Sequence, residues 1–409
     1  MWMLDAFLKR IVVNGRLIAI DPDGRVHEYG RAADGFPELT IRLTDSAVQR
    51  AIISNPQLGA GEGFMDGRLI VEQGDIRDLI DIILHNLRWE NAGLLQDSAL
   101  RRALGSVKGK LDRINWQAKS KRNVAHHYDL SDRLYDLFLD ADRQYSCAYY
   151  TDPANSLEQA QRDKKAHIAA KLNLRPGNRV LDIGCGWGGM ALYINEVSGA
   201  EVLGVTLSEE QLKVARRRAE EKGVADKVKF ELIDYRNVTG TFDRIVSVGM
   251  FEHVGPAHYE TFFAKCRSLL AEDGAMLLHT IGRIGTPGVT DAWTAKYIFP
   301  GGYSPSLSEI VTASERAHLI VSDVETLRLH YALTLDEWYA RTNAAKAEIV
   351  ALYDERFFRM WQFYLAGAAA AFKFGDHVNF QLQYIRDRYA LPMTRDYMTA
   401  TEHDLTPFS

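Results

Sequence analysis

The segment 179–189 constrains the fold more than any other part of the chain. Arg179–Ile183 has the composition of a short buried strand, and it runs directly into the glycine-rich turn Gly184-Cys185-Gly186-Trp187-Gly188-Gly189. Glycine permits a tight turn from strand to helix and lets a ligand approach the backbone closely. The glycines are spaced G-x-G-x-G-G, which differs from the G-x-G-x-x-G of dinucleotide-binding proteins. A strand–turn–helix unit that can hold a ligand against its backbone is therefore predicted.

Strands and helices alternate from about residue 156 onward. Two helix starts have the spacing of a capping box, Ser156 with Gln159 and Ser208 with Gln211. Further short apolar strands are expected at 201–206, 228–233, 244–248 and 275–280. Strands separated by helices predict a parallel sheet with right-handed crossovers. The expected fold class is α/β, with a Rossmann-like, doubly wound and mostly parallel sheet.

Composition places the chain among ordinary globular proteins. Hydrophobic residues make up 46% and charged residues 25% of the 409 residues, which excludes wholesale disorder, collagen-like repeats and a polytopic membrane protein. A membrane-spanning helix needs about 20 apolar residues, so the shorter apolar run 363–372 predicts a buried core helix. The three cysteines are too few and too scattered for a disulfide framework or a zinc site. We therefore expect a reducing, cytoplasmic compartment and no bound metal.

The N-terminal region predicts a separate, smaller α+β domain. The pair Asn14-Gly15 lies between two apolar runs, which is typical of a β-hairpin. Glycines at 59, 61, 63 and 67 indicate a loop-rich stretch. We place this domain at residues 1–100.

A basic segment follows this domain. Residues 101–122 carry eight Lys and Arg residues against the single Asp112, although the whole chain has a net charge of −5. We expect a basic linker helix there. Such clusters suit nucleic acid or anionic lipid head groups, and each basic residue near an anionic membrane contributes about 1 kcal/mol. A solvated helix face is the remaining interpretation.

Polar side chains are also expected at the carboxyl edge of the sheet. Glu252 and His253 directly follow the predicted strand 244–248, and His279 ends the strand 275–280. In doubly wound sheets this edge lines the ligand crevice. Read alone, Glu252 would more often be solvated, His279 a core histidine with satisfied nitrogens, and Cys147 a small buried hydrophobe.

The glycine-rich unit resembles motif I of the class I S-adenosylmethionine-dependent methyltransferases. A Rossmann-like turn for another nucleotide is the alternative. Many such folds carry an acidic residue after the second strand for the ribose hydroxyls, but this chain has Thr206-Leu207-Ser208 there. Ribose recognition is therefore expected to fall to Gln211, a hydroxyl or the backbone. Adenine contacts are expected near Asp234-Tyr235-Arg236.

Several sequence blocks together resemble one family within this fold, the cyclopropane-fatty-acyl-phospholipid synthases. The blocks are His127–Leu130, Gln144–Tyr149, Leu181–Gly189, Asp243–Gly255, Leu278–Gly282 and Tyr297–Gly302. The likeness is strong over 123–390, so residues 123–409 are expected to form the catalytic domain. Residues 1–100 resemble the extra domain of the phospholipid-acting members, which implies a lipid- or membrane-recognition domain and favours a membrane phospholipid as substrate.

The resemblance implies a reaction. A methyl group moves from S-adenosylmethionine to the cis double bond of an unsaturated acyl chain, and proton loss from that carbon then closes a cyclopropane ring. In this family the base is a bound bicarbonate ion. The bicarbonate ligands and catalytic positions implied here are Cys147, Glu252, His279, the backbone at Ile281, and Tyr331.

The resemblance also implies a set of S-adenosylmethionine contacts. They are Tyr145, Ser146, Gly184, Gly186, Gly188, Thr206, Leu207, Gln211, Tyr235 and Arg236. The implied partners are membrane phospholipids with unsaturated acyl chains, an anionic membrane surface and a second copy in a homodimer. No nucleic-acid partner is expected. The implied location is cytoplasmic, at the periphery of the inner membrane.

Three other functions stay open at this stage. The first is a related methyltransferase that methylates a carbon of the acyl double bond and gives a methyl-branched, methylene or hydroxylated product. The second is a small-molecule or nucleic-acid methyltransferase, although the sequence lacks the Pro-Cys and Asn-Pro-Pro-Tyr motifs of DNA methylases. The third is a lipid-binding protein without catalysis, which the occupied set of five site positions disfavours.

Overall fold

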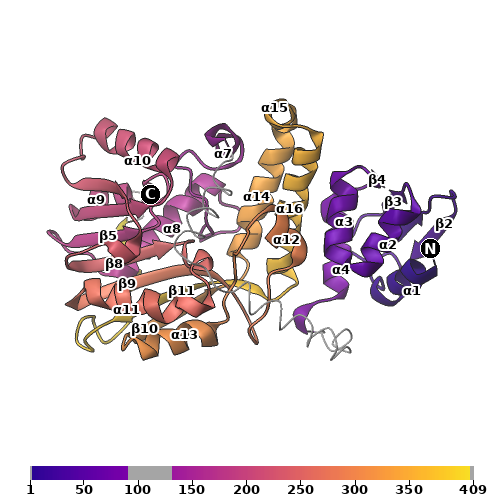
Figure 1. Cartoon of the computed structure of the whole chain (residues 1–409). Coiled ribbons are helices and arrows are strands. Elements are labelled where there is room, and N and C mark those ends of the chain that lie inside the picture. The colour runs from indigo at the N-terminus through magenta and orange to yellow at the C-terminus, as the bar shows by residue number, and fades with distance from the viewer. Residues whose placement is uncertain (1, 91–130, 406–409) are drawn as a thin grey trace. The chain divides into compact units, whose positions relative to one another are not determined.

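The computed structural model describes residues 2–90 and 131–405, which fall into two compact units (Figure 1). Unit 1 comprises 1–105, 290–300 and 332–376, and unit 2 comprises 106–289, 301–331 and 377–409. The sequence groups everything after residue 123 into one domain, whereas two of these later segments cluster with the N-terminal unit. The predicted linker helix 101–122 and the block His127–Leu130 lie outside the described residues.

Unit 2 is built on a seven-stranded sheet with the order β10-β11-β9-β8-β5-β6-β7. Its strands are β5 (Arg179–Ile183), β6 (Glu201–Thr206), β7 (Val228–Leu232), β8 (Phe242–Val248), β9 (Leu270–Arg283), β10 (Ile320–Leu327) and β11 (His377–Ile385). Strands β5 to β9 run parallel, while β11 lies antiparallel between β9 and β10. The predicted doubly wound, mostly parallel sheet is thereby confirmed.

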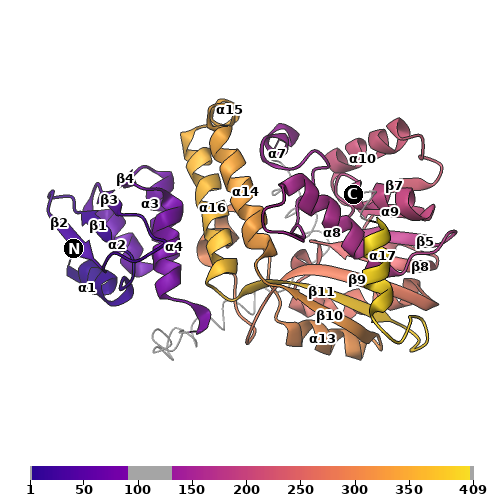
Figure 2. The same cartoon turned by 180° about the vertical axis from the view of Figure 1, so that it is seen from behind.

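Helices cover both faces of this sheet (Figures 1 and 2). They are α7 (Asp132–Phe138), α8 (Leu157–Leu172), α9 (Gly189–Ser198), α10 (Glu209–Glu221), α11 (Tyr259–Leu269), α13 (Leu307–Arg316) and α17 (Asp396–Leu405), with short 3-10 turns at Tyr235–Asn237, Phe251–His253 and Pro256–His258. Alternate strand residues face two apolar cores. Leu181 and Leu278 belong to the core with α11 and α13, whereas Val180 and Leu277 belong to the core with α8, α9 and α10.

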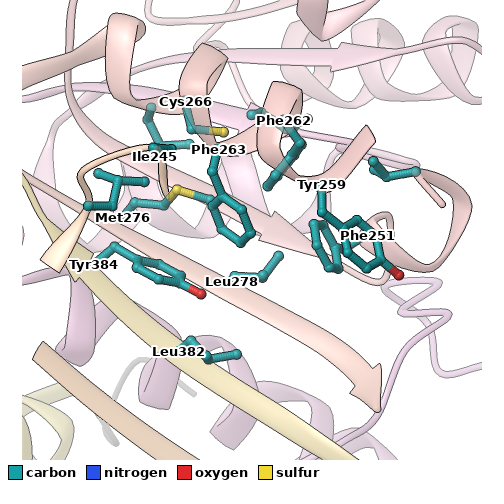
Figure 3. Packing of buried hydrophobic residues seen from close by; sticks show 14 of the residues in the cluster. Ile245, Phe251, Tyr259, Phe262, Phe263, Cys266, Met276, Leu278, Leu382 and Tyr384 are labelled. Carbon is teal, nitrogen blue, oxygen red and sulfur yellow. The ribbon is translucent and has the colours of Figure 1, made fainter. Parts of the chain in front are cut away.

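Aromatic side chains fill the core beneath α11. Phe262 and Phe263 point from α11 toward the sheet, where Met276 of β9 and Tyr384 of β11 meet them (Figure 3). The Phe263 and Tyr384 ring centroids lie 5.3 Å apart, within the usual range for tilted aromatic pairs. This core closes one face of the sheet, so His279 of β9 and the polar residues Asn379, Gln381 and Gln383 of β11 face α8 instead.

The helix starts follow the predicted caps only in part. The Ser156 and Ser208 hydroxyls accept the Gln159 and Gln211 backbone N–H groups at 3.2 and 3.3 Å. The Gln211 side chain accepts the Thr206 hydroxyl at 3.0 Å. It therefore does not complete the predicted capping box, because the strand end offers it another partner.

Unit 1 contains a four-stranded sheet with the order β2-β1-β3-β4. Its elements are α1 (Trp2–Ile11), β1 (Leu17–Ile20), β2 (Val26–Tyr29), β3 (Leu39–Leu43), α2 (Ser46–Ser54), α3 (Pro56–Met65), β4 (Leu69–Gln73), α4 (Ile76–Asn86), α12 (Ala292–Tyr297), α14 (His330–Ala344), α15 (Lys346–Leu352) and α16 (Glu355–Lys373). The first two residues of α14, His330 and Tyr331, belong to unit 2. The run 363–372 lies within α16, as predicted. Within the described residues, no helix has the length and apolar character needed to cross a membrane.

The hairpin predicted at Asn14-Gly15 is wrong. Ile11 ends a helix, and β1 pairs instead with β2 across the turn that follows Asp21. The reason lies in α4, where Asn86 binds the backbone around the pair. Its Oδ1 accepts the Asn14 N–H at 2.9 Å, and its Nδ2 donates to the Asn14 carbonyl at 2.8 Å. These bonds occupy backbone groups that a hairpin ladder would use.

The glycine-rich loop predicted at 59–67 is wrong as well. Three of its glycines lie inside helix α3, because close packing needs the missing side chains. A Cβ on Gly59 would lie 2.3 Å from the Ala51 carbonyl carbon, and one on Gly61 would lie 2.4 Å from the Trp293 ring. Tertiary contact thus overrides the low helix propensity of glycine.

A pair of Gly-to-Ala substitutions tests this explanation. Gly59→Ala should lower the free energy of unfolding by about 1–3 kcal/mol, because its methyl group overlaps the α2 backbone. Gly367→Ala in α16 is the matched control, since a Cβ there meets nothing within 4 Å. The control should raise the free energy of unfolding by up to about 1 kcal/mol. Urea denaturation measures both, and equal effects of the two substitutions would contradict the packing argument.

Candidate active site

A cavity lies at the carboxyl edge of β5, β6, β7 and β8. Its empty space is about 1240 Å³, part of it open to solvent, which is ample for a nucleoside-sized ligand. The cavity is lined by nine of the ten residues expected to contact the cofactor: Tyr145, Ser146, Gly184, Gly186, Thr206, Leu207, Gln211, Tyr235 and Arg236. The tenth, Gly188, is not among the lining residues. Parallel strands bring these distant segments to one edge, as doubly wound sheets do.

The glycines of the turn serve three different purposes. Gly184 has φ +83°, and a Cβ there would lie 2.8 Å from the Met250 Cβ. Gly186 has φ +54°, and a Cβ there would meet nothing within 4 Å, so this residue opens onto the cavity. A Cβ on Gly188 would lie 2.7 Å from the Phe230 ring. Gly188 therefore lets α9 pack closely on the sheet and does not line the cavity.

The sequence has no acidic residue directly after β6 to bind ribose hydroxyls, but two other polar side chains, Gln211 and Arg236, line this part of the cavity. Gln211 Oε1 accepts the Thr206 hydroxyl at 3.0 Å, so Nε2 is the end of this amide that can serve a ligand. On the neighbouring strand end, Arg236 donates to both Asp234 oxygens at 2.8 and 2.7 Å. These hydrogen bonds raise the pKa of Arg236. The arrangement offers donors and an acceptor to a neutral, hydroxyl-rich ligand.

Helix α8 holds the loop that carries Tyr145, Ser146 and Cys147. Gln161 Nε2 donates to the Gln144 and Ser146 carbonyls at 3.2 and 3.0 Å. The buried Lys164 ammonium donates to Gln144 Oε1 at 2.6 Å and to Ser146 Oγ at 3.0 Å. The loop is thus fixed by bonds to side chains that water does not reach.

Buried charges face each other beneath this loop. Asp182 is 2% exposed, and burial raises its pKa to about 7. Burial lowers the pKa of Lys164 to about 8, while nearby Asp140 and Asp142 raise it. Within the described ranges, Asp182 Oδ2 is buried without a hydrogen-bond partner. A cationic donor such as an ammonium group would satisfy it.

Glu252 and Ile281 are in direct contact. The Ile281 N–H donates to Glu252 Oε1 at 2.6 Å, while Oε2 is buried and has no partner among the described residues. Burial raises the pKa of Glu252 to about 7. In sequence, Glu252 stands between Met250 and His253, both of which line the cavity. A buried carboxyl with this pKa can accept or donate a proton near neutral pH.

His279 lies two residues before Ile281 on the same face of β9. It is 1% exposed, and burial lowers its pKa to about 3, so the ring is neutral. Its nitrogens contact the side-chain amides of Asn379 at 3.0 Å and Gln381 at 3.1 Å. Both ring nitrogens of His279 therefore have a side-chain partner within the core.

A hydrogen bond links the loop that carries Cys147 to the start of α14, which carries Tyr331. Cys147 is fully buried, and burial strongly raises the pKa of its thiol. Tyr331 lies in the first turn of α14 and is 6% exposed. The neighbouring His330 accepts the Tyr150 N–H at Nδ1 at 2.9 Å. This bond joins the start of α14 to the loop that carries Cys147.

Several buried polar residues around the site were not found from the sequence. Lys164 and Lys171 occur in a lysine-rich helix where any lysine would be assigned to solvent. Asn379, Gln381 and Gln383 alternate with apolar residues on β11, a pattern typical of a half-exposed strand. All five are buried because each faces another polar group across the α8 face of the sheet. The burial of these side chains depends on the groups that they contact in the folded protein, so no local sequence pattern could predict it.

Comparison with known proteins identifies relatives of this protein. A family model described as mycolic acid cyclopropane synthetase matches residues 116–382. The sequence is 40% identical over 359 residues to cyclopropane-fatty-acyl-phospholipid synthase of Escherichia coli K12, a match that covers 87% of this chain and 90% of that protein. It is 42% identical over 391 residues to a probable fatty acid methyltransferase of Pseudomonas putida, with 92% and 94% covered.

A solved structure matches about two thirds of the chain. Mycolic acid cyclopropane synthase CmaA1, in complex with SAH and CTAB, aligns with a TM-score of 0.62 and 34% sequence identity. The match covers 64% of this chain and 97% of that one.

The raised pKa of Glu252 has a measurable consequence for stability. Folding raises it from 4.5 to about 7, so the folded state holds this proton more tightly. The resulting stabilisation is fully present below the unfolded pKa and is lost as the pH rises through about 7. Relative to Glu252→Gln, the wild-type free energy of unfolding should fall by about 1–3 kcal/mol between pH 4.5 and 8.

Urea denaturation of both proteins across this range measures the difference. Glu209→Gln, at an exposed position that begins α10, is the control and should show no such trend. A difference between wild type and Glu252→Gln that does not change with pH would contradict the buried-carboxyl interpretation.

Proposed function

The chain belongs to the mycolic acid cyclopropane synthetase family, and on this premise we propose its reaction. It transfers a methylene group from S-adenosylmethionine to the cis double bond of an unsaturated acyl chain in a membrane phospholipid, which becomes a cyclopropane fatty acid. The observation that carries the proposal is the buried Glu252–Ile281 pair, since Met250 and His253, on either side of Glu252 in the sequence, line the cavity. The phospholipid substrate is supported by the Escherichia coli relative, which matches 87% of this chain.

The cavity fits S-adenosylmethionine as the co-substrate. Gly186 leaves room for a ligand against the backbone, and the unpartnered Asp182 oxygen can accept from the α-ammonium group. We assign Thr206 and Gln211 to the ribose hydroxyls and Tyr235 and Arg236 to adenine, because these residues follow β6 and β7 and line the cavity. An alkene is a weak nucleophile, so the main task of these residues is to hold the sulfonium in a near-attack position.

We propose that a bicarbonate ion binds beside Glu252. The buried and unpartnered Glu252 Oε2 calls for a hydrogen-bond donor, which the hydroxyl of bicarbonate provides. When bound, bicarbonate supplies the base that takes the proton lost during ring closure. We propose Cys147, Glu252, His279, the Ile281 backbone and Tyr331 as its surroundings. Because the Ile281 N–H is bonded to Glu252, its part is to orient that carboxyl.

The protein residues then protect a cationic stage of the reaction. After methyl transfer, positive charge develops on the former double bond, and water would trap it as an alcohol. Buried Cys147 and His279 keep water from this position. The proton must leave from the added carbon, so the base has to lie on that side of the acyl chain.

A second candidate is a methyltransferase that methylates a carbon of the acyl double bond and gives a methyl-branched or methylene product. It shares every step up to methyl transfer and differs in where the proton is lost. This second function is supported by the similarity to the probable fatty acid methyltransferase of Pseudomonas putida, which is 42% identical to this protein.

Mass spectrometry of phospholipid acyl chains separates the two products. We expect that the purified protein, with S-adenosylmethionine and vesicles of a monounsaturated phosphatidylethanolamine, adds one CH2 and removes the double bond. Glu252→Gln should lower the rate by about 10²–10⁴-fold, because the proton-loss step loses its positioned group. Its cofactor affinity should be unchanged, and Glu209→Gln should remain fully active.

Other outcomes would contradict the proposal in different ways. The same mass gain with the double bond retained would identify the methyltransferase alternative. Full turnover by folded Glu252→Gln would remove Glu252 from the site. No mass gain with intact cofactor binding would exclude a phospholipid acyl chain as substrate.

We also propose that the protein docks on an anionic membrane surface as a peripheral homodimer at the inner membrane. The support for membrane docking is the charge of the segment 101–122, whose structure lies outside the described residues, and the homodimer follows from the family resemblance alone. Making Lys108, Lys110, Lys119 and Lys121 neutral should weaken binding to anionic vesicles by about 4 kcal/mol at most, at about 1 kcal/mol per residue. Vesicle co-sedimentation measures this. Unchanged binding would exclude the segment as the docking surface.

A further inference from the structure

The ring of His279 lies between two side-chain amides of β11. Asn379 Nδ2 is 3.0 Å from His279 Nε2, and Gln381 Nε2 is 3.1 Å from His279 Nδ1. Gln381 is the strand partner of His279, and Asn379 is the partner of Ile281. All of these side chains point to the face of the sheet that α8 covers. The ring is 1% exposed, so water cannot replace either amide.

A neutral imidazole has one N–H donor and one acceptor nitrogen. The two amide nitrogens cannot both donate to it, so one amide must present its oxygen. The two ends of an amide have the same shape, and only their other partners decide which end faces the ring. The question is therefore which of the two amides is held in place by a group other than His279.

Gln381 is held by Lys171. The Lys171 ammonium donates to Gln381 Oε1 at 2.7 Å and also contacts Glu325 Oε2. The same Glu325 oxygen is 2.7 Å from His167 Nε2. An ammonium group has three donors and no acceptor, so the oxygen of Gln381 must face Lys171. The nitrogen of Gln381 is then left to donate to His279 Nδ1.

We propose that Lys171 and Gln381 are positioning residues that hold His279 in the neutral tautomer with its proton on Nε2. Nδ1 is the acceptor for Gln381, so the proton can only be on the other nitrogen. Asn379 must then present its oxygen to Nε2–H. That exchange supplies a donor for Asn379 Oδ1, which otherwise is buried without a partner in the described part of the chain.

Other charged groups favour a neutral ring in this position. Burial lowers the pKa of His279, and the Lys164, Lys171 and His167 charges lower it further, while Glu325 opposes them. Hydrogen bonds to Glu325 and Glu402 raise the pKa of His167 in spite of its burial. Positive charge therefore collects on α8, and His279 stays uncharged but polarised.

The assigned tautomer gives His279 a definite role, which rests on the proposed function. The Nε2–H donates to Asn379 Oδ1 and so fixes the plane of the ring two residues before Ile281, whereas an unprotonated Nε2 would repel that oxygen and leave the ring without a fixed position. Lys171 and Gln381 reach the reaction only through His279. They would therefore affect turnover without touching the acyl chain or the cofactor.

Nitrogen-15 NMR of histidine-labelled, full-length protein tests the tautomer without substrate or bicarbonate. Protonated and unprotonated ring nitrogens have well-separated shifts, and the His279 signals are those that His279→Gln removes. We expect a protonated Nε2 and an unprotonated Nδ1 in the wild type. In Gln381→Glu, a carboxylate faces Nδ1, so we expect the proton to move to Nδ1 and kcat to fall at least tenfold with little change in KM for S-adenosylmethionine.

Two further variants separate positioning from a general loss of structure. Lys171→Met frees the amide of Gln381 and should give a mixture of both tautomers. Glu209→Gln, at an exposed position that begins α10, is the control and should leave the His279 signals as they are.

Three results would overturn the proposal. They are a wild-type ring protonated at Nδ1, an unchanged tautomer in folded Gln381→Glu, and a shifted tautomer with undiminished kcat. Failure of the proposed function looks different. In that case the wild-type protein makes no modified lipid, while the NMR signals still follow the expected pattern.

Discussion

A layer of buried charge between α8 and the sheet holds both parts of the candidate site in place. Lys164 points toward the loop of Ser146 and toward Asp182, on the side of the cofactor cavity. Further along α8, Lys171 reaches Gln381 and so His279. Each ammonium needs partners because water does not reach it, and an unpaired buried charge costs several kcal/mol. The helix thereby ties two separate segments to one frame.

This layer explains why the polar residues face one side of the sheet. Large aromatic side chains beneath α11 fill the other face, where Phe263 meets Tyr384. With one face closed to polar groups, the alternation of β9 and β11 directs His279 and Gln381 toward α8. A shift of β11 by one residue would bring its glutamines into the aromatic core and its phenylalanine onto the lysines. The aromatic packing beneath α11 therefore fixes the register of β11 and, with it, the polar contacts of His279 and Gln381.

In unit 1, tertiary packing outweighs local sequence preference in determining the secondary structure at two places. Glycine is a poor helix former, yet α3 contains three, among them Gly61, which allows the Trp293 ring to pack against the helix. Asn14-Gly15 is a strong turn signal, yet Asn86 binds its backbone. In both places a contact between residues distant in sequence outweighs a preference of about 1 kcal/mol. Local propensity could not reveal these contacts, because it depends on sequence neighbours alone.

The sequence by itself determined the parallel sheet, the glycine turn and the segments that meet at its carboxyl edge, because apolar periodicity and the order of elements are local properties. The family resemblance of its motifs also indicated nine residues that line the cavity. Only the tertiary structure decided that Gly188 serves packing, that Lys164 and Lys171 are buried, and that Gln381 faces both Lys171 and His279. These depend on which groups meet across the interior, where every buried donor and acceptor must find its partner in another part of the protein.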